Sequence, residues 1–133
     1  GVEARPYVVR DIRDAEGEVL ETFAPRVLND FSAFSSEIHE VRQGLEAAVA
    51  KDYGTAHKLG NLPMTVAGKT GSAQIQNNTK VNAFFVGYAP VENPEIAILV
   101  LIEEAKEGSL NTIPIVKDVL QWYYENRVAT DKK

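Results

Sequence analysis

An unbroken apolar run at residues 96–102 is the feature that most restricts the fold of this chain. A second, shorter run stands at residues 83–86. Strands with apolar side chains at successive positions are buried on both faces of a sheet. We therefore expect a sheet that helices cover on each side.

Turn-forming residues divide the stretch around these runs. Residues 76–80 form one polar turn, and residues 90–94, with a proline at each end, form another. Connections this short join antiparallel neighbours. The sequence therefore predicts three antiparallel strands within residues 64–104.

Two segments have the apolar periodicity of helices. Ser35 or Ser36 can cap the first one, which we place within residues 35–52. The second is predicted at residues 112–128, with Pro114 in its first turn and a frayed tail at residues 128–133. Its apolar stripe consists of Ile115, Val116, Val119, Leu120, Tyr123 and Tyr124.

The first part of the chain, residues 1–34, reads as a hairpin and a linker. Pro6 to Arg13 and Glu18 to Phe23 are the two arms, and Asp14 to Gly17 is the turn between them. The expected fold class is α+β, an antiparallel sheet flanked by helices. Two helices are too few to cover both apolar faces of the sheet. We therefore expect another part of the protein to cover the remaining apolar surface.

Composition excludes several classes of function. The chain of 133 residues has 19 acidic and 14 basic side chains, a formal net charge of -5, and its basic residues are scattered. We therefore expect no nucleic-acid partner. The absence of cysteine removes disulfides and thiolate sites. Neither His39 nor His57 has a partner at metal-ligand spacing, so we predict no metal and no cofactor.

The ends of the chain suggest that it is a piece of a longer protein. It starts at Gly1, and its only methionine is Met64. No apolar run reaches the length of a membrane span. We expect an upstream part of the protein that is missing here.

The segment from Ala67 to Gln74 carries the chemistry. Gly68-Lys69-Thr70 ends like a phosphate-binding P-loop, but that motif needs another glycine five residues before Gly68, where Pro63 stands. The P-loop also opens a helix, whereas this segment leads into a polar turn and a strand. We therefore reject a phosphate site.

The other interpretation is the Lys-Thr-Gly element of serine acyltransferases that react with penicillin. Lys69 would place an ammonium beside a nucleophile and attract a substrate carboxylate. Thr70 and Ser72 could donate hydrogen bonds to that carboxylate, and the Ser72 N–H could serve in an oxyanion hole. Gly71 would let a substrate backbone lie close to the strand. As a bare tripeptide, however, Lys-Thr-Gly is more often a solvated strand end.

The surrounding residues favour the second interpretation. Met64 to Gln74, followed by Asn82 to Pro90, resembles the C-terminal part of the transpeptidase domain of class B penicillin-binding proteins, of the penicillin-binding protein 2 type. Nearly the whole chain takes part in the resemblance. Further similar segments are Arg5 to Val9, Asp14 to Gly17, Gly54 to Ala56, Asn93-Pro94 and Ile113 to Val116.

That family has three active-site motifs: Ser-x-x-Lys with the nucleophile, then Ser-x-Asn, then Lys-Thr-Gly. Only the third is present, because no serine here has a lysine three residues later. Ser109-Leu110-Asn111 has the letters of the second motif, but it follows Lys69, and we interpret it as a loop before the last helix. The resemblance thus implies one wall of an active site, without the nucleophile and inactive alone.

The resemblance also implies roles for single residues. Lys69 and Ser72 are the catalytic candidates, and Thr70, Gly71 and Gln74 are the candidates for substrate contact. In a regular strand Gln74 shares a face with Ser72 and not with Lys69. We expect the strand around Thr70 to line an open groove, and burial of Thr70 beneath a helix would contradict that.

The function that the resemblance implies is that of a peptidoglycan D,D-transpeptidase of cell wall cross-linking. A serine attacks the D-Ala-D-Ala end of a stem peptide, and an amine of another stem peptide takes over the acyl group; β-lactams trap the serine. The full protein would be anchored in the cytoplasmic membrane, face the periplasm or the exterior, and act with a membrane-anchored glycosyltransferase complex. A D,D-carboxypeptidase, a serine β-lactamase, a β-lactam-sensing domain and a binding module without chemistry remain alternatives.

Overall fold

The computed structural model describes residues 1–77 and 79–129. The chain divides into two compact units, Gly1–Glu40 and Val41–Lys133. Residue 78 of the expected polar turn and residues 130–133 of the expected tail lie outside the described residues.

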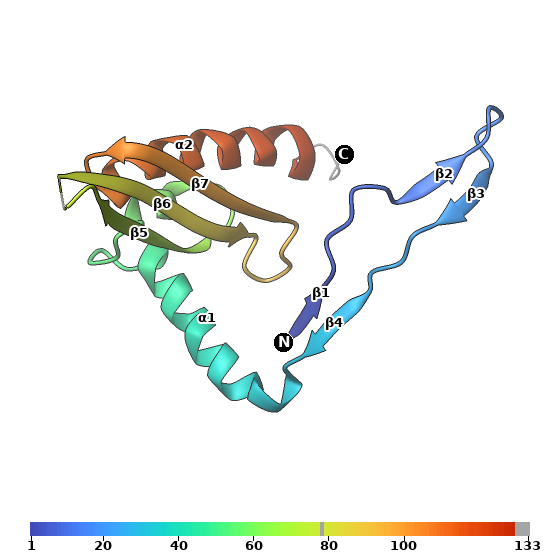
Figure 1. The fold of residues 1–133 in the computed structure, drawn as a ribbon, viewed down its shortest axis with the longest axis horizontal. Coiled ribbons are helices and arrows are strands. Elements are labelled where there is room, and N and C mark those ends of the chain that lie inside the picture. Colours follow the sequence, from blue (N-terminus) through green and yellow to red (C-terminus); the bar gives the residue numbers. More distant parts are fainter. Residues whose placement is uncertain (78, 130–133) are drawn as a thin grey trace. The chain divides into compact units, whose positions relative to one another are not determined.

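The Gly1–Glu40 unit is built from two antiparallel strand pairs (Figure 1). Strand β1 (Val2–Ala4) pairs with β4 (Val27–Asp30), and β2 (Asp11–Arg13) pairs with β3 (Val19–Thr22). The pair β2–β3 lies within the arms of the expected hairpin, whereas the sequence analysis missed β1–β4. The strands of that second pair are only three and four residues long, too short for a pattern of alternation to be recognised.

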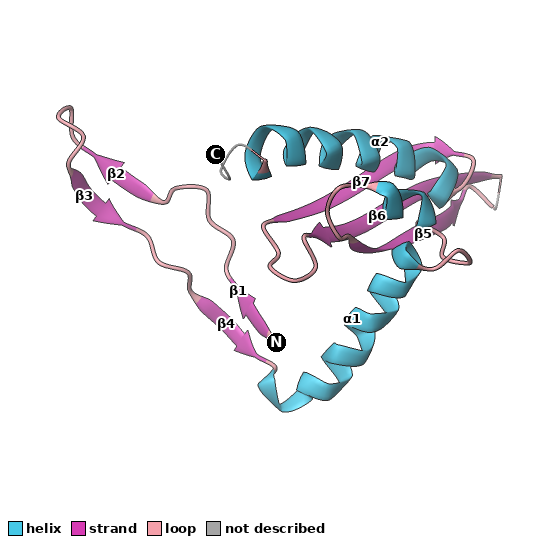
Figure 2. Cartoon of the chain, turned by 180° about the vertical axis from the view of Figure 1, so that it is seen from behind, coloured by secondary structure: helices cyan, strands magenta, loops and turns pink. Residues whose placement is uncertain are grey.

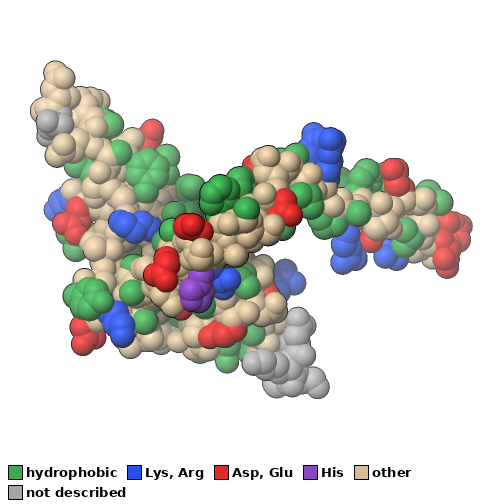
Figure 3. All heavy atoms as spheres, turned by 90° about the horizontal axis from the view of Figure 1, so that it is seen from below, with side chains coloured by type: hydrophobic (Ala, Val, Ile, Leu, Met, Phe, Trp, Pro, Cys, Tyr) green, Lys and Arg blue, Asp and Glu red, His purple; other side chains and the backbone are tan. Residues whose placement is uncertain are grey.

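The tip of the β2–β3 hairpin is held by one side chain. The carboxylate of Asp14 accepts hydrogen bonds from the backbone N–H groups of Glu16 at 3.1 Å and Glu18 at 2.8 Å. Gly17 has a φ of +89°, a conformation that a side chain disfavours. No residue of the described unit Gly1–Glu40 is buried, and apolar and charged side chains lie open along it (Figure 3).

The Val41–Lys133 unit contains the sheet. Strands β5 (Ala67–Ile75), β6 (Lys80–Ala89) and β7 (Ile96–Ala105) are antiparallel in the order β5-β6-β7. The register of β5 on β6 is regular from Ala67 opposite Tyr88 to Ile75 opposite Lys80. It places each β5 side chain on a definite face.

Helices cover one face of this sheet. Helix α2 (Gly108–Tyr123) contacts all three strands, and a π-helical turn, η3 (Tyr124–Val128), continues it (Figure 1, Figure 2). The end of α1 (Ser35–Ala50), which follows the 3-10 turn η1 (Ser32–Phe34), and the short helix η2 (His57–Asn61) complete the cover. The buried core between them consists of Val49, Ala56, Leu59, Leu62, Val66, Phe85, Ala89, Ile113, Val116 and Leu120.

The last helix begins earlier than the sequence analysis placed it. The segment Ser109 to Asn111, expected to be a loop, forms the first turn of α2, and Pro114 lies inside the helix. The side chain of Asn111 accepts hydrogen bonds from the N–H groups of Lys106 at 3.0 Å and Glu107 at 3.2 Å. These bonds hold the chain before Gly108, so the helix starts there and not at residue 112.

The expectation of helices on both faces is wrong for the described residues. Val86, Leu99 and Leu101 are 53%, 68% and 47% exposed. They lie on the face away from Phe85, because side chains alternate along β6 and β7. Within residues 1–77 and 79–129, the sheet is covered on the Phe85 face alone.

Candidate active site

Strand β5 presents the Lys-Thr-Gly residues at the edge of the sheet. It has one partner strand, β6, among the described residues, so its other edge is unpaired. The regular register puts Lys69 on the open face, opposite Val86. Thr70, Ser72 and Gln74 alternate with it and lie on the face that carries Phe85.

Lys69 is exposed and has one described contact. Its Nζ donates a hydrogen bond to the carbonyl oxygen of Thr70 at 2.6 Å. The ammonium is thereby held beside the strand backbone. It can turn toward an anionic or polar group brought to the open face.

Thr70 is buried, and the expectation that it lines an open groove is wrong for this structure. Its side chain is 8% exposed, on the face of the sheet that α2 covers. The hydroxyl donates a hydrogen bond to Oγ1 of Thr55 at 2.8 Å. The physical reason is strand alternation: Thr70 lies opposite Phe85, the largest buried side chain, and points into the same layer.

Ser72 lies two positions further along this face and is exposed. Its Oγ accepts a hydrogen bond from the backbone N–H of Gly108 at 2.9 Å. Gly71, between Thr70 and Ser72, is half-buried, and Gln74 is exposed. The strand thus carries an exposed ammonium at residue 69 on the open face and an exposed hydroxyl at residue 72 on the opposite face, along the same unpaired edge.

Two residues of this neighbourhood were missed as site residues. Thr55 stands in Gly54 to Ala56, a segment already noted for its resemblance but given no role. Gly108 carried no sequence signal, because its contact with Ser72 joins positions 36 apart. Only the folded sheet places the start of α2 against β5.

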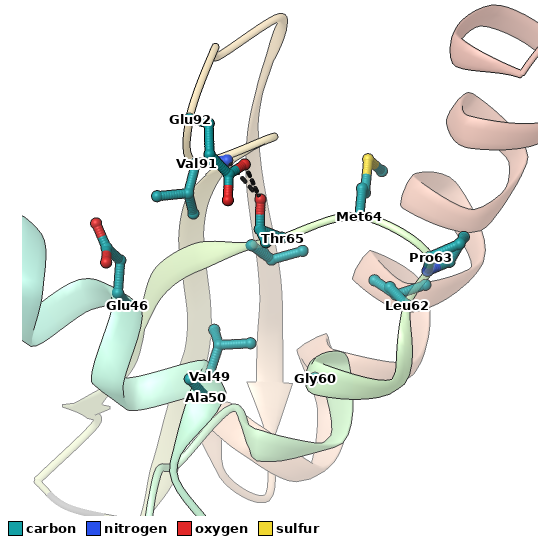
Figure 4. A pocket seen from close by; sticks show the side chains of 11 residues that line it. Glu46, Val49, Ala50, Gly60, Leu62, Pro63, Met64, Thr65, Val91 and Glu92 are labelled. Carbon is teal, nitrogen blue, oxygen red and sulfur yellow. Dashed lines mark hydrogen bonds between the residues drawn. The ribbon is translucent and has the colours of Figure 1, made fainter.

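A cavity of about 510 Å³ opens elsewhere, at the approach to β5 (Figure 4). Thr65 lines this cavity and bonds two other lining residues. Its hydroxyl donates to the Glu92 carboxylate and accepts from the N–H of Val91 at 2.9 Å. The bond from Thr65 holds the pKa of Glu92 below its usual value. The lining residues are Glu46, Val49, Ala50, Gly60, Leu62, Pro63, Met64, Thr65, Val66, Val91 and Glu92.

Replacing Thr65 with valine should raise the pKa of Glu92 toward its ordinary value, since the largest cause of the lowered pKa is lost. A carboxyl whose pKa is lowered by folding stabilises the fold above its unfolded pKa, and that contribution disappears as the pH falls through the folded pKa. The variant should therefore lose more stability near neutral pH than in acid, where only the loss of the bond from the Val91 N–H remains. A carboxyl NMR titration of Glu92 measures the shift.

The matched control is Thr79→Val, because the hydroxyl of Thr79 bonds the carbonyl of Gln76 and no carboxylate. An unchanged Glu92 titration in Thr65→Val, or an equal change in both variants, would contradict this assignment.

In residues 1–77 and 79–129, no group of three or more histidine or acidic side chains is placed to hold a metal ion. No helix in the same described ranges has the length and apolar character needed to cross a bilayer.

Comparison with protein families matches residues 1–121 to the family Transpeptidase, described as "Penicillin binding protein transpeptidase domain". Penicillin-binding protein 2A of Bacillus subtilis is 31% identical along the whole chain. Peptidoglycan D,D-transpeptidase MrdA of Haemophilus influenzae is 30% identical along 96% of the chain. The chain spans 21% and 22% of the lengths of these relatives.

Solved structures have the same fold. The D,D-transpeptidase domain of a peptidoglycan glycosyltransferase from Eggerthella lenta matches 92% of the chain with a TM-score of 0.71 at 30% identity. The chain covers 28% of that structure. Penicillin-binding protein 2B of Streptococcus pneumoniae, at 22% identity, matches 96% of the chain with a TM-score of 0.77, and the chain covers 22% of it.

The structure therefore has the mixed helix and antiparallel-sheet fold of penicillin-binding transpeptidases. The family match covers most of the chain, including all of β5 and the start of α2. The chain belongs to the penicillin-binding protein transpeptidase domain family.

Proposed function

We propose that this chain forms one wall of the active site of a peptidoglycan D,D-transpeptidase and that the serine nucleophile comes from another part of the same protein. The observation that carries the proposal is an exposed Lys69 and an exposed Ser72 on the unpaired edge strand β5. The names of the relatives support the activity. Because the chain spans about a fifth of such relatives, the reaction belongs to the whole protein.

The substrate in this proposal is an extended stem peptide ending in D-Ala-D-Ala. It lies along the free edge of β5, as peptides do when they add to a sheet edge. Gly71 has no side chain to keep that backbone away. The Ser72 hydroxyl donates to the terminal carboxylate, and the exposed side chain of Gln74 contacts the peptide further along the same face.

Lys69 and the backbone of Ser72 serve the chemical step. The Lys69 ammonium stands beside the incoming serine and favours the deprotonated oxygen that attacks the peptide carbonyl. The Ser72 N–H is one donor of the oxyanion hole. Thr70 has a different role from the one first expected. Its hydrogen bond to Thr55 holds β5 in place between Lys69 and Ser72.

The reaction proceeds through an acyl-enzyme. The serine oxygen bonds to the carbonyl carbon of the penultimate D-Ala, and the terminal D-Ala leaves with the transferred proton. An amine of a second stem peptide then takes the acyl group and frees the serine. β-Lactams acylate the same serine. Transfer to water in place of an amine would make the enzyme a D,D-carboxypeptidase, so the acceptor separates the two activities.

Location and partners follow from the same proposal. The whole protein is anchored in the cytoplasmic membrane, with this domain facing the periplasm or the exterior, where peptidoglycan lies. It works with a membrane-anchored glycosyltransferase complex. A relative, the penicillin-binding protein PBP2 of Helicobacter pylori, has been solved in a complex with MreC.

Penicillin labelling tests the division of the site between two parts of the protein. The isolated chain, incubated with a fluorescent penicillin, should carry no covalent label by gel or mass spectrometry, because no Ser-x-x-Lys is present. The whole protein, under the same conditions, should be labelled at one serine outside this chain. Stoichiometric labelling of the isolated chain would overturn the proposal.

A further inference from the structure

Among the described residues, one hydrogen bond joins the start of α2 to β5. The backbone N–H of Gly108, the first residue of α2, donates to Oγ of Ser72 at 2.9 Å. Gly108 is buried, whereas Ser72 is exposed. The contact thus lies between the covered layer and the surface of the strand.

This contact decides what the Ser72 hydroxyl can do. A serine hydroxyl has one hydrogen to donate and two lone pairs that accept. A backbone N–H can only donate, so Gly108 occupies a lone pair and leaves the hydroxyl hydrogen free. Among the described residues, Ser72 Oγ has no recorded acceptor for that hydrogen. The hydroxyl is therefore held as a donor toward a group that arrives from outside.

Position 108 has room for glycine alone. An added Cβ would lie 2.5 Å from the carbonyl oxygen of Gly71, 3.0 Å from its carbonyl carbon and 3.2 Å from Oγ of Ser72. The first two atoms belong to the backbone of β5 and cannot turn aside. A larger residue would push the helix start away from the strand and lengthen the bond to Ser72.

The direction of the Gly108 N–H is itself held from two sides. The Asn111 side chain accepts from the N–H groups just before Gly108. The hydroxyl of Thr112, fully buried, donates to the carbonyl oxygen of Gly108 at 2.6 Å. The donor that meets Ser72 therefore lies in a turn that side chains hold on both sides.

We infer that Gly108 is a positioning residue for Ser72: its N–H turns the serine hydroxyl hydrogen toward the terminal carboxylate of a bound peptide or β-lactam. Gly108 touches no substrate in this arrangement. The inference rests on the proposed function, because it needs a substrate carboxylate beside Ser72.

The test measures acylation of the whole protein by a penicillin and by the methyl ester of that penicillin. Gly108→Ala should lower the second-order rate constant for the free penicillin about tenfold, the upper effect of one hydrogen bond. The rate constant for the ester, which has no carboxylate charge to receive the hydroxyl hydrogen, should fall less than about threefold. A loss of overall structure would lower both equally.

A double-variant cycle shows whether Gly108 acts through Ser72. Ser72→Ala should lower acylation by the free penicillin about 30-fold, because it removes a hydrogen bond to a charged group. Adding Gly108→Ala to Ser72→Ala should lower the rate constant further by less than about threefold, since coupled residues are not additive.

Control variants separate positioning from folding. Gly44→Ala is the matched glycine change, because an added Cβ at position 44 of α1 meets no atom within 4 Å, and it should leave both rate constants unchanged. If Gly108→Ala does not fold, Asn111→Ala loosens the same turn without adding an atom. It should lower the penicillin-to-ester ratio about threefold.

The outcomes are distinguishable. Equal losses for penicillin and ester, or a full second loss in the Ser72→Ala background, would overturn the inference about Gly108 alone. If Ser72→Ala left acylation unchanged, the proposed role of Ser72 would fail, and the inference with it. The selective loss in Gly108→Ala, absent in Gly44→Ala, is the result expected.

Discussion

Lys69→Ala is expected to lower the second-order rate constant for acylation of the whole protein by a penicillin about 100-fold or more, with the fold intact. Lys69 is exposed on the open face of β5, and its Nζ bonds only a backbone carbonyl among the described residues. Removing it takes away no core contact. It removes the one cation of β5, which in the proposed mechanism favours the attacking form of the serine.

Two variants control this experiment. Lys80→Ala removes a half-buried lysine of the same sheet, which pairs with Glu104 at 2.6 Å, and should change acylation less than about twofold. Lys69→Arg keeps the charge but not the compact ammonium. Its rate constant for acylation should therefore lie between those of Lys69→Ala and the parent. Fluorescent penicillin labelling over time measures all three variants. Unchanged acylation in Lys69→Ala would remove Lys69 from the site.

Phe85→Ala is expected to destabilise the transpeptidase domain by about 3–5 kcal/mol. Phe85 is fully buried, and its ring packs against Gly68 and Gly87, which lie opposite each other on β5 and β6. An added Cβ would lie 2.4 Å from its ring at Gly68 and 2.8 Å from it at Gly87. The ring thus fills the space that the missing side chains of these two glycines leave, and neither glycine has a side chain to fill the cavity that alanine leaves.

Denaturant unfolding of the domain measures this loss. Phe85→Leu keeps most of the volume and should cost less than about half as much as Phe85→Ala. Tyr53→Ala, an aromatic change at a side chain that is 83% exposed in this structure, should stay within about 0.5 kcal/mol. A loss below about 1 kcal/mol for Phe85→Ala would show that the Phe85 layer is not the core of this unit.

Several features were predictable because their signal is local. Apolar runs at residues 83–86 and 96–102 predicted strands, and the structure has β6 and β7 there. Periodic apolar residues predicted both long helices. The residues around Lys69 carried the family resemblance, and the family match confirms it. Each of these signals lies within a few neighbouring positions of the chain.

Helix ends were less predictable. Pro114 suggested a first turn, because a proline inside a helix removes a hydrogen bond, yet it lies inside α2. The hydrogen bonds of Asn111 that hold it involve Lys106 and Glu107 in a segment without an apolar pattern. The sequence alone does not show whether Pro114 or Asn111 decides where the helix begins.

Residue types and their order along the chain were enough to identify the three strands of the sheet, the long helices and the Lys-Thr-Gly element. The faces of those strands were settled by packing: α2 lies on the side of Phe85, so Thr70 is buried against Thr55 while Lys69 stays open. The bond from Gly108 to Ser72 likewise exists because the sheet brings the start of α2 to the edge of β5. Alternation along a strand says which residues share a face, but only the elements packed upon the sheet say which face is buried.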